Sequence, residues 1–247
     1  MPDYQPCFIE GADRPSRWLV ACDHAANHVP SAVNGGSLGI PAADMARHIA
    51  YDPGAAGVTR ALARLLDGRA ILSNFSRLVI DPNRGEDDPT LVMRLYDGSV
   101  IAGNRKAGAG EIEHRKALCY RPYHDAYAAL ASARPDSAIV AVHSFTPRLN
   151  GQPARPWHVG ILHAGDRRLS GPLLQSLRRD PSLCVGENEP YKGHLPGDSI
   201  DRHALAHGRQ NTLIELRSDL IETAEQQQAW AARLAPMLAA ALARAGD

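Results

Sequence analysis

The stretch Ala138-Ile-Val-Ala-Val-His-Ser-Phe-Thr-Pro147 begins with an apolar run and continues directly into a histidine. A short apolar run that contains β-branched residues is typical of a strand buried on both faces of a sheet. Working outward in both directions, similar runs occupy residues 18–21, 70–72, 78–80, 159–162 and 212–216. Together these runs predict the strands of one largely buried sheet.

Helical patterns alternate with the apolar runs. Apolar residues recur at helical spacing over residues 53–66, 111–131, 168–178 and 226–245. Pro53 suits a first helical turn, Pro122 is expected to interrupt the second helix, and Pro236 is expected to kink the last one. The alternation predicts an α/β fold, a three-layer sandwich with helices on both faces of a mixed, mostly parallel sheet.

The chain shows no segment that resembles an interdomain linker, so a single domain over residues 1–247 is expected. Two stretches rich in Gly, Pro and acidic residues, 83–89 and 186–202, have no clear helical or strand pattern. Loops of this length are often functional. Both are therefore expected to contribute to a site.

Composition excludes several classes of protein. Lys+Arg and Asp+Glu both number 27, so bulk attraction to nucleic acid or to an anionic membrane is not expected. The sequence contains neither an apolar run of about 18 residues nor a secretory signal at its N-terminus. The four cysteines form no CxxC pair and predict reduced thiols in a cytoplasmic protein. They are Cys7, Cys22, Cys119 and Cys184.

Two histidines follow predicted strands. His24 lies just after residues 18–21, and His143 comes directly after the run that opens this section. In open α/β sheets, ligands bind at the carboxyl ends of the strands, and imidazole nitrogen is a good zinc ligand. The alternative for each histidine is a ring that only hydrogen-bonds to the backbone. Two such placements in one chain favour a zinc site.

A catalytic zinc usually has three protein ligands and a water, so a third ligand is needed. Asp52 is the preferred candidate, although an aspartate before Pro53 is also typical of a helix N-cap. Asn27 stands three residues after His24, where an HxxE site would have a glutamate, and an amide oxygen is a weak zinc ligand. His28 and Asp23 remain further candidates.

Glu215 is a carboxylate inside an apolar run, a position that is unfavourable unless the group is paired or functional. Arg217 lies two residues on, hence on the same strand face, so a structural ion pair between them is the alternative. As a functional group, Glu215 would be the general base that accepts a proton from water activated by the metal.

A third cluster is basic. Arg77 and Arg84 flank residues 78–80, and Asn83 precedes Arg84. The planar guanidinium matches a carboxylate in a two-point contact, so Arg77, Asn83 and Arg84, and also Arg217, are candidates for binding a substrate that carries carboxylates. The alternative is a set of surface arginines paired with the acidic run at residues 86–88.

Several of these motifs occur in the same order in one known family. The sequence resembles the N-formylglutamate amidohydrolases, with closest similarity to the branch known only as predicted members, over roughly residues 18–220. The resemblance rests on Cys22-Asp-His-Ala-Ala-Asn27, Tyr51-Asp-Pro-Gly54, Ser76-Arg-Leu-Val-Ile-Asp-Pro-Asn-Arg84, His143-Ser-Phe-Thr-Pro147, Asn188-Glu-Pro-Tyr191 and Ile214-Glu-Leu-Arg-Ser-Asp-Leu220.

The resemblance implies a fold akin to the zinc carboxypeptidases, with a mixed eight-stranded sheet between helices. It implies hydrolysis of N-formyl-L-glutamate to formate and glutamate, a late step of histidine breakdown. It also implies metal binding by His24, an acid and His143, a catalytic role for Glu215, and carboxylate binding by Asn83 and Arg84.

Asn27 departs from the carboxypeptidase-like pattern, which has glutamate at that place, and Asp52 is therefore expected as the second ligand. Two other functions stay open. One is a zinc amidase or carboxypeptidase that acts on another acylated amino acid or peptide. The other is a ligand-binding protein on the same fold without catalytic activity. The sequence leaves the oligomeric state open.

Overall fold

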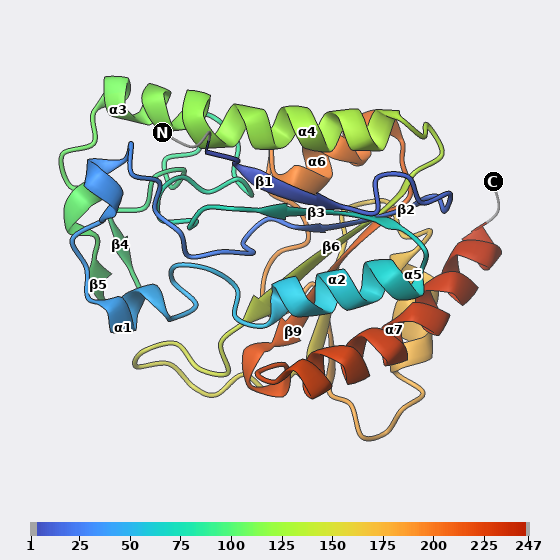
Figure 1. Ribbon diagram of the computed structural model, residues 1–247. Helices are drawn as coiled ribbons and strands as arrows, with labels where there is room; N and C mark the ends of the chain where they lie inside the picture. Colours follow the sequence, from blue (N-terminus) through green and yellow to red (C-terminus); the bar gives the residue numbers. More distant parts are fainter. Residues whose placement is uncertain (1–3, 246–247) are drawn as a thin grey trace.

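A computed structural model describes residues 4–245 of the chain (Figure 1). Its centre is a seven-stranded sheet with the order β1-β3-β2-β6-β9-β7-β8. The strands are β1 (Cys7–Glu10), β2 (Trp18–Cys22), β3 (Arg69–Ser73), β6 (Ala138–Phe145), β7 (Val159–Leu162), β8 (Val185–Glu187) and β9 (Asn211–Arg217).

The sheet is mixed and mostly parallel, as predicted. Strands β3, β2, β6 and β9 run parallel to one another, and β7 runs parallel to β8. Only the pairs β1–β3 and β7–β9 are antiparallel. The family resemblance implied eight strands, whereas this sheet has seven within residues 4–245. A separate hairpin, β4 (Leu95–Tyr96) with β5 (Ser99–Val100), lies outside the sheet.

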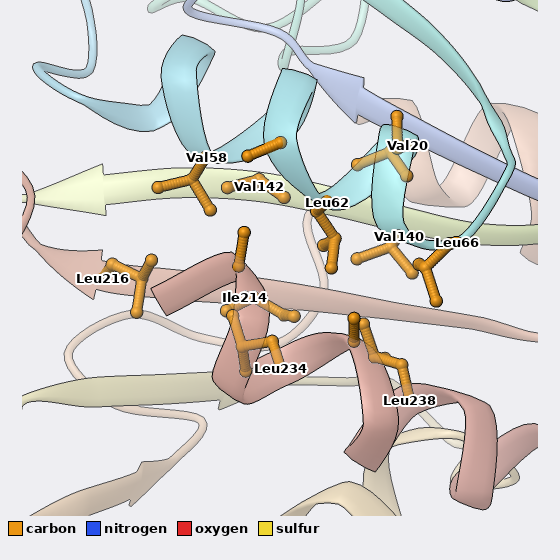
Figure 2. Close-up of a cluster of buried hydrophobic side chains, with 14 of the residues drawn as sticks. Val20, Val58, Leu62, Leu66, Val140, Val142, Ile214, Leu216, Leu234 and Leu238 are labelled. Atoms are coloured by element: carbon orange, nitrogen blue, oxygen red, sulfur yellow. The ribbon is translucent and has the colours of Figure 1, made fainter. Parts of the chain in front are cut away.

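One face of the sheet is covered by α2 (Ala55–Leu65), α5 (Ser170–Leu177) and α7 (Ala224–Ala245). Alternate residues of each strand point to this face because successive side chains of a strand lie on opposite sides. Figure 2 shows Val140 of β6 and Ile214 of β9 facing Leu62 of α2 and Leu234 of α7. All four side chains are fully buried.

The opposite face is covered by α4 (Arg121–Ser132), with α6 (Ser199–His203) beside it. Leu19, Ala21, Ile139 and Ala141 point to this face and belong to the same apolar cluster as aromatic residues of α4. The structure is thus the three-layer α/β sandwich that the sequence predicts.

The predicted helix over residues 111–131 is continuous rather than interrupted. It consists of α3 (Ala109–Arg115), a π-helical turn over Lys116–Tyr120, and α4. Pro122 lies in the first turn of α4 and lacks an N–H group. The π turn directly before Pro122 has a different hydrogen-bond pattern from an α-helix. The N–H that Pro122 lacks therefore does not interrupt the helix.

The run at residues 78–80 is buried but is not a strand, which corrects the prediction from its apolar sequence. The Leu78 N–H donates to Ser76 Oγ at 3.1 Å, and the Val79 N–H donates to the Ser76 carbonyl at 2.9 Å. These local bonds form a turn and use the donors that a strand would offer to a neighbour. Periodicity alone does not separate the two structures in so short a run.

The remaining elements are short. They are α1 (Ala42–Met45) and 3₁₀ turns over Asn34–Gly36, Ala102–Asn104, Leu205–His207 and Ser218–Leu220. The stretch 186–202 contains the end of β8 and the start of α6, with irregular chain between them. Within residues 4–245, no helix combines the length and the apolar character that crossing a bilayer requires.

Replacement of Leu62 by alanine tests the packing between α2 and the sheet. Leu62 has no exposed surface. We expect the free energy of unfolding to fall by about 2–5 kcal/mol, because a large buried side chain is lost and a cavity remains. Leu65 of the same helix is 54% exposed and is the matched control, for which Leu65→Ala should change little. Equal effects of the two substitutions in urea unfolding would contradict the packing described.

A buried pair of histidines joins α4 to α6. His124 Nδ1 lies 2.9 Å from His203 Nε2, and the His203 ring stacks on Tyr127. Burial lowers the pKa of His124 to about 4 and that of His203 to about 3. The folded protein therefore holds both rings neutral.

This pair should make the protein less stable in mild acid. Histidine in an unfolded chain titrates near pH 6.5, so below that pH the unfolded state binds more protons than the folded state. We expect the free energy of unfolding to decrease as the pH falls from about 6.5 toward 4. NMR titration of the imidazole signals would show both rings neutral near pH 5.5. A ring that gains its proton above that pH while the protein stays folded would contradict the expectation.

Candidate active site

The carboxyl ends of three neighbouring parallel strands position the candidate residues. Asp23 and His24 directly follow β2, while His143 and Glu215 lie near the ends of β6 and β9. His143 and Glu215 are direct partners in the register of these two strands. His143 was expected just past the strand end, but β6 continues to Phe145 because its pairing with β9 extends that far.

Asp52 does not cap a helix. The N-cap of α2 is Gly54, with φ of 82°, a left-handed conformation that favours glycine. The Asp52 N–H donates to the His24 carbonyl at 2.9 Å, which ties the two segments together. Asp52 Oδ2 accepts a hydrogen bond from the Ser144 N–H at 3.2 Å. The carboxylate is thus held toward the sheet edge, and the interpretation of Asp52 as a plain N-cap is wrong.

The three expected ligands converge on one point. Asp52 Oδ2 lies 3.3 Å from His24 Nδ1 and 2.9 Å from His143 Nδ1. One ligand atom from each of the three residues lies within 4.8 Å of the others, and all three residues are buried. Zinc–nitrogen and zinc–oxygen bonds are about 2.0–2.2 Å long, so atoms this close can share one ion.

The other nitrogen of each ring contacts a further carboxylate. His24 Nε2 lies 2.7 Å from Asp81 Oδ1, and His143 Nε2 lies 3.2 Å from Asp23 Oδ2. An ionised carboxylate only accepts hydrogen bonds, so each Nε2 is assigned as the N–H donor. Metal-binding histidines are usually oriented in this way.

The donor set fits a metal ion. With the proton on Nε2, each neutral ring directs the lone pair of Nδ1 toward Asp52, which itself has only acceptors. Such a group of acceptors is stable only with a positive charge among them. A divalent cation would supply that charge, as would protonation of His143. Two imidazoles and one carboxylate are a ligand set that zinc commonly takes.

The surroundings hold the two aspartates Asp52 and Asp23 in their charged form. Burial opposes ionisation of Asp52, but the nearby His24 and His143 outweigh it and hold its pKa well below the usual range. Burial likewise opposes ionisation of Asp23, yet its contact with His143 lowers the pKa to about 2. For His143, burial favours the neutral ring, but Asp23 and Asp52 raise its pKa well above the usual value.

Glu215 is buried, and its Oε2 has no hydrogen-bond partner within residues 4–245. Burial raises the pKa of Glu215 to about 7, with His143 acting in the opposite direction. A carboxyl group with this pKa can both accept and release a proton at neutral pH. Buried groups with such shifted values are common at active sites.

Arg217 does not pair with Glu215. Its guanidinium forms an ion pair with Asp219, with Nε 2.8 Å from Oδ1, and contacts backbone carbonyls that precede β7. Arg217 is also absent from the lining of the cavity described next. The structure therefore does not bring this candidate to the site.

A cavity of about 200 Å³ opens beside the cluster. Its lining includes the three expected metal ligands and Glu215. It also includes the residues between 77 and 84 that were predicted to bind a substrate carboxylate, and parts of the stretch 186–202. The lining residues are His24, Asp52, Arg77, Asn83, Arg84, Tyr96, His143, Ser144, Leu162, Tyr191, Lys192, Gly193, Leu195, Asp198, Ile200, Leu213 and Glu215.

The two arginines of the lining differ. Arg77 forms ion pairs with Asp52 at 3.4 Å and with Asp81 at 3.0 Å, so its charge is balanced inside the site. Arg84 donates to Thr90 Oγ1 and to the Asn83 carbonyl and forms no ion pair within residues 4–245. Neither arginine pairs with the acidic run at residues 86–88, which sets aside the alternative of surface ion pairs.

The other candidate ligands lie elsewhere. The Asn27 side chain donates to the Met45 carbonyl at 2.8 Å, and the His28 ring stacks on Tyr4. Neither residue lines the cavity. Asp23 is near the cluster, but it contacts His143 on the ring nitrogen that faces away from Asp52.

Sequence reasoning missed Tyr123 and Ser199, which support the site from outside through Asp23. Asp23 Oδ1 accepts hydrogen bonds from Tyr123 Oη and from Ser199 Oγ, both at 2.7 Å. The Ser199 N–H donates to Asn83 Oδ1 at 3.2 Å. Helix α6 is thereby joined to His143 through Asp23 and to the Asn83 loop. Only the position of Asp23 next to His24 hinted at these contacts.

Comparisons with known proteins identify the family of the chain and proteins of similar fold. Gene product Atu2144 from Agrobacterium tumefaciens, known from a crystal structure, has 32% sequence identity to this chain. The alignment covers 98% of this chain and 96% of the Agrobacterium chain, with a TM-score of 0.91. An N-formylglutamate amidohydrolase from Ralstonia eutropha JMP134 is 21% identical, covers 98% and 97% of the two chains, and shares the fold with a TM-score of 0.66. A comparison with curated proteins found no match. The sequence model of the N-formylglutamate amidohydrolase family matches residues 16–222 of this chain. Because this match covers most of the chain, the chain belongs to the N-formylglutamate amidohydrolase family and is an amidohydrolase.

Proposed function

We propose that this chain is a zinc-dependent amidohydrolase that cleaves N-formyl-L-glutamate, or a similar N-acyl amino acid, to the free acid and the amino acid. The observation that carries the proposal is the convergence of His24, Asp52 and His143 beside the unpartnered carboxyl of Glu215 in one cavity. The named activity of the Ralstonia eutropha protein and the family model support the formyl amide as the bond that is cleaved.

The metal would be held by His24 Nδ1, His143 Nδ1 and Asp52. When bound, zinc supplies a Lewis acid that polarises the amide carbonyl and makes a water more acidic. Asp81 and Asp23 keep the two imidazoles in the tautomer and orientation that ligation needs. Arg77 holds Asp52 and Asp81 in place through its ion pairs and brings a positive charge to the cavity wall.

Glu215 moves the proton. It takes a proton from the attacking water, whose oxygen adds to the carbonyl carbon, and then delivers that proton to the amide nitrogen as the C–N bond breaks. The products are formate and glutamate with a free amino group. A pKa near 7 suits both halves of this transfer, since the same carboxyl must be charged in the first half and protonated in the second.

Asn83 and Arg84 would receive the α-carboxylate of the substrate. Both line the cavity, and Asn83 is adjacent to the metal cluster because its N–H donates to Asp81 Oδ1 at 2.9 Å. The guanidinium of Arg84 has no competing ion pair within the described part of the chain. The reaction is a late step of histidine breakdown, and the free thiols of the four cysteines support a cytoplasmic location.

The metal requirement is tested by removal and replacement. We expect a chelator to abolish hydrolysis of N-formyl-L-glutamate and added Zn²⁺ to restore it. His143→Ala should lower kcat/KM at least about a hundredfold, because loss of even an outer partner of a metal ligand costs 10–100-fold. His114→Ala is the matched control, since that ring is exposed and lies outside the cavity. Full turnover in the chelated enzyme would refute zinc dependence.

The role of Glu215 is tested by Glu215→Gln, which keeps the shape of the side chain but removes the base. We expect kcat to fall by about 10²–10⁴-fold with metal content unchanged. In the unaltered enzyme, kcat/KM should fall as the pH drops below about 7, because the base must be ionised, and a bound cation would move this limb lower. Glu222→Gln, at an exposed acid, is the control. An unchanged rate for Glu215→Gln would exclude Glu215 as the base.

A further inference from the structure

The charges that face the cavity are not all balanced within the protein. Arg77 is neutralised by Asp52 and Asp81. The Asp198 carboxylate accepts hydrogen bonds from the N–H groups of Leu195 and Asp201 as the N-cap of α6. Within residues 4–245, Arg84 and Lys192 are the lining cations that form no ion pair. The cavity therefore presents two free positive charges to a ligand.

Lys192 lies on a firmly held part of the stretch 186–202. On one side of it, Tyr191 Oη accepts a hydrogen bond from Arg155, whose guanidinium also lies over the Tyr191 ring at 5.1 Å from its centroid. On the other side, Gly193 packs so closely that a Cβ there would meet the His163 carbonyl oxygen at 2.0 Å. The backbone of Lys192 is thus fixed on both sides, while its side chain is exposed and lines the cavity.

We propose that Lys192 determines the substrate class by binding a second carboxylate, the one on the side chain of the amino acid. This inference rests on the proposed function. It makes Lys192 the residue that distinguishes acidic from neutral N-acyl amino acids within that activity.

The chemistry of the substrate fits this division of the cavity. The α-carboxylate is attached to the same carbon as the acylated nitrogen, so it must lie near the reacting atoms. Asn83 and Arg84 lie there, since Asn83 bonds to the partner of His24. The side-chain carboxylate of glutamate is separated from that carbon by two methylene groups and reaches farther out. Lys192 lines the same cavity with an exposed side chain and can therefore meet such a group.

The test compares two substrates that differ only in the outer charge, N-formyl-L-glutamate and N-formyl-L-glutamine. We expect Lys192→Met to lower kcat/KM for the glutamate compound about tenfold, mainly through KM, as loss of one charge-assisted hydrogen bond would. For the glutamine compound, kcat/KM should change by no more than about twofold. Lys192→Arg should keep most of the preference for the glutamate compound. Added salt should reduce this preference in the unaltered enzyme and in Lys192→Arg, but not in Lys192→Met. Lys106→Met, at an exposed lysine outside the cavity, is the matched control.

Equal losses on both substrates, or no loss on either, would overturn the role of Lys192 while leaving the proposed activity in place. If the unaltered enzyme hydrolyses neither compound, the proposed function fails, and binding decides the inference. Calorimetry would then compare glutarate with its monoamide in the unaltered protein and in Lys192→Met. Tighter binding of glutarate that is lost in the variant supports the second carboxylate site. Equal binding of the two ligands, or no binding of either, overturns it.

Discussion

Two imidazole nitrogens and a carboxylate oxygen meet at one buried point, and the rest of the site is arranged around the positive charge that this meeting requires. His24 Nδ1, His143 Nδ1 and Asp52 Oδ2 are all acceptors when the Nε2–H of each neutral ring donates a hydrogen bond to an outer carboxylate. The Ser144 N–H and Arg77 donate to Asp52 but not to the two Nδ1 atoms, whose lone pairs face the Asp52 carboxylate, and buried polar atoms without a donor are unfavourable. Asp23 and Asp52 favour a proton on His143 when no metal is bound. The same negative charges would attract a metal cation to the cluster.

The fold supplies this point through strand order rather than through a local motif. Strands β2, β6 and β9 are adjacent and parallel, so the segments at their carboxyl ends share one edge of the sheet although they are far apart in sequence. The register of β6 and β9 then places Glu215 beside His143. A shift of one residue would turn Glu215 to the opposite face, since successive side chains alternate. Packing of the strands, part of which Figure 2 shows, therefore also fixes the position of Glu215 relative to His143.

The sequence was enough to predict the layers, most strands and the residues of the cluster, because these depend on apolar periodicity and on polar groups placed after strands. It failed where the outcome depended on hydrogen bonds between distant segments. The run at 78–80 has the composition of a strand, but Ser76 binds its N–H groups locally. For Asp52, the preferred third ligand, the N-cap alternative stayed open from the sequence, and it is the contacts of its side chain with Ser144 and two histidines that exclude it. The contact of Ser199 with Asp23 joins segments far apart in the chain and has no sequence signature.

Arg77 shows why predicting a residue at the site differs from predicting its role. The sequence favours a substrate contact, and Arg77 does line the cavity, yet both of its nearest anions belong to the protein. Burial would lower its pKa, but Asp81 leads the groups that raise it, so the charge is permanent and already matched. A guanidinium with two carboxylate partners has little left to offer a third. The inner wall, where each polar group has several protein partners, is therefore suited to hold a metal rigidly. An anionic ligand in the cavity would instead meet Arg84 and Lys192, the lining cations that form no ion pair within the described residues.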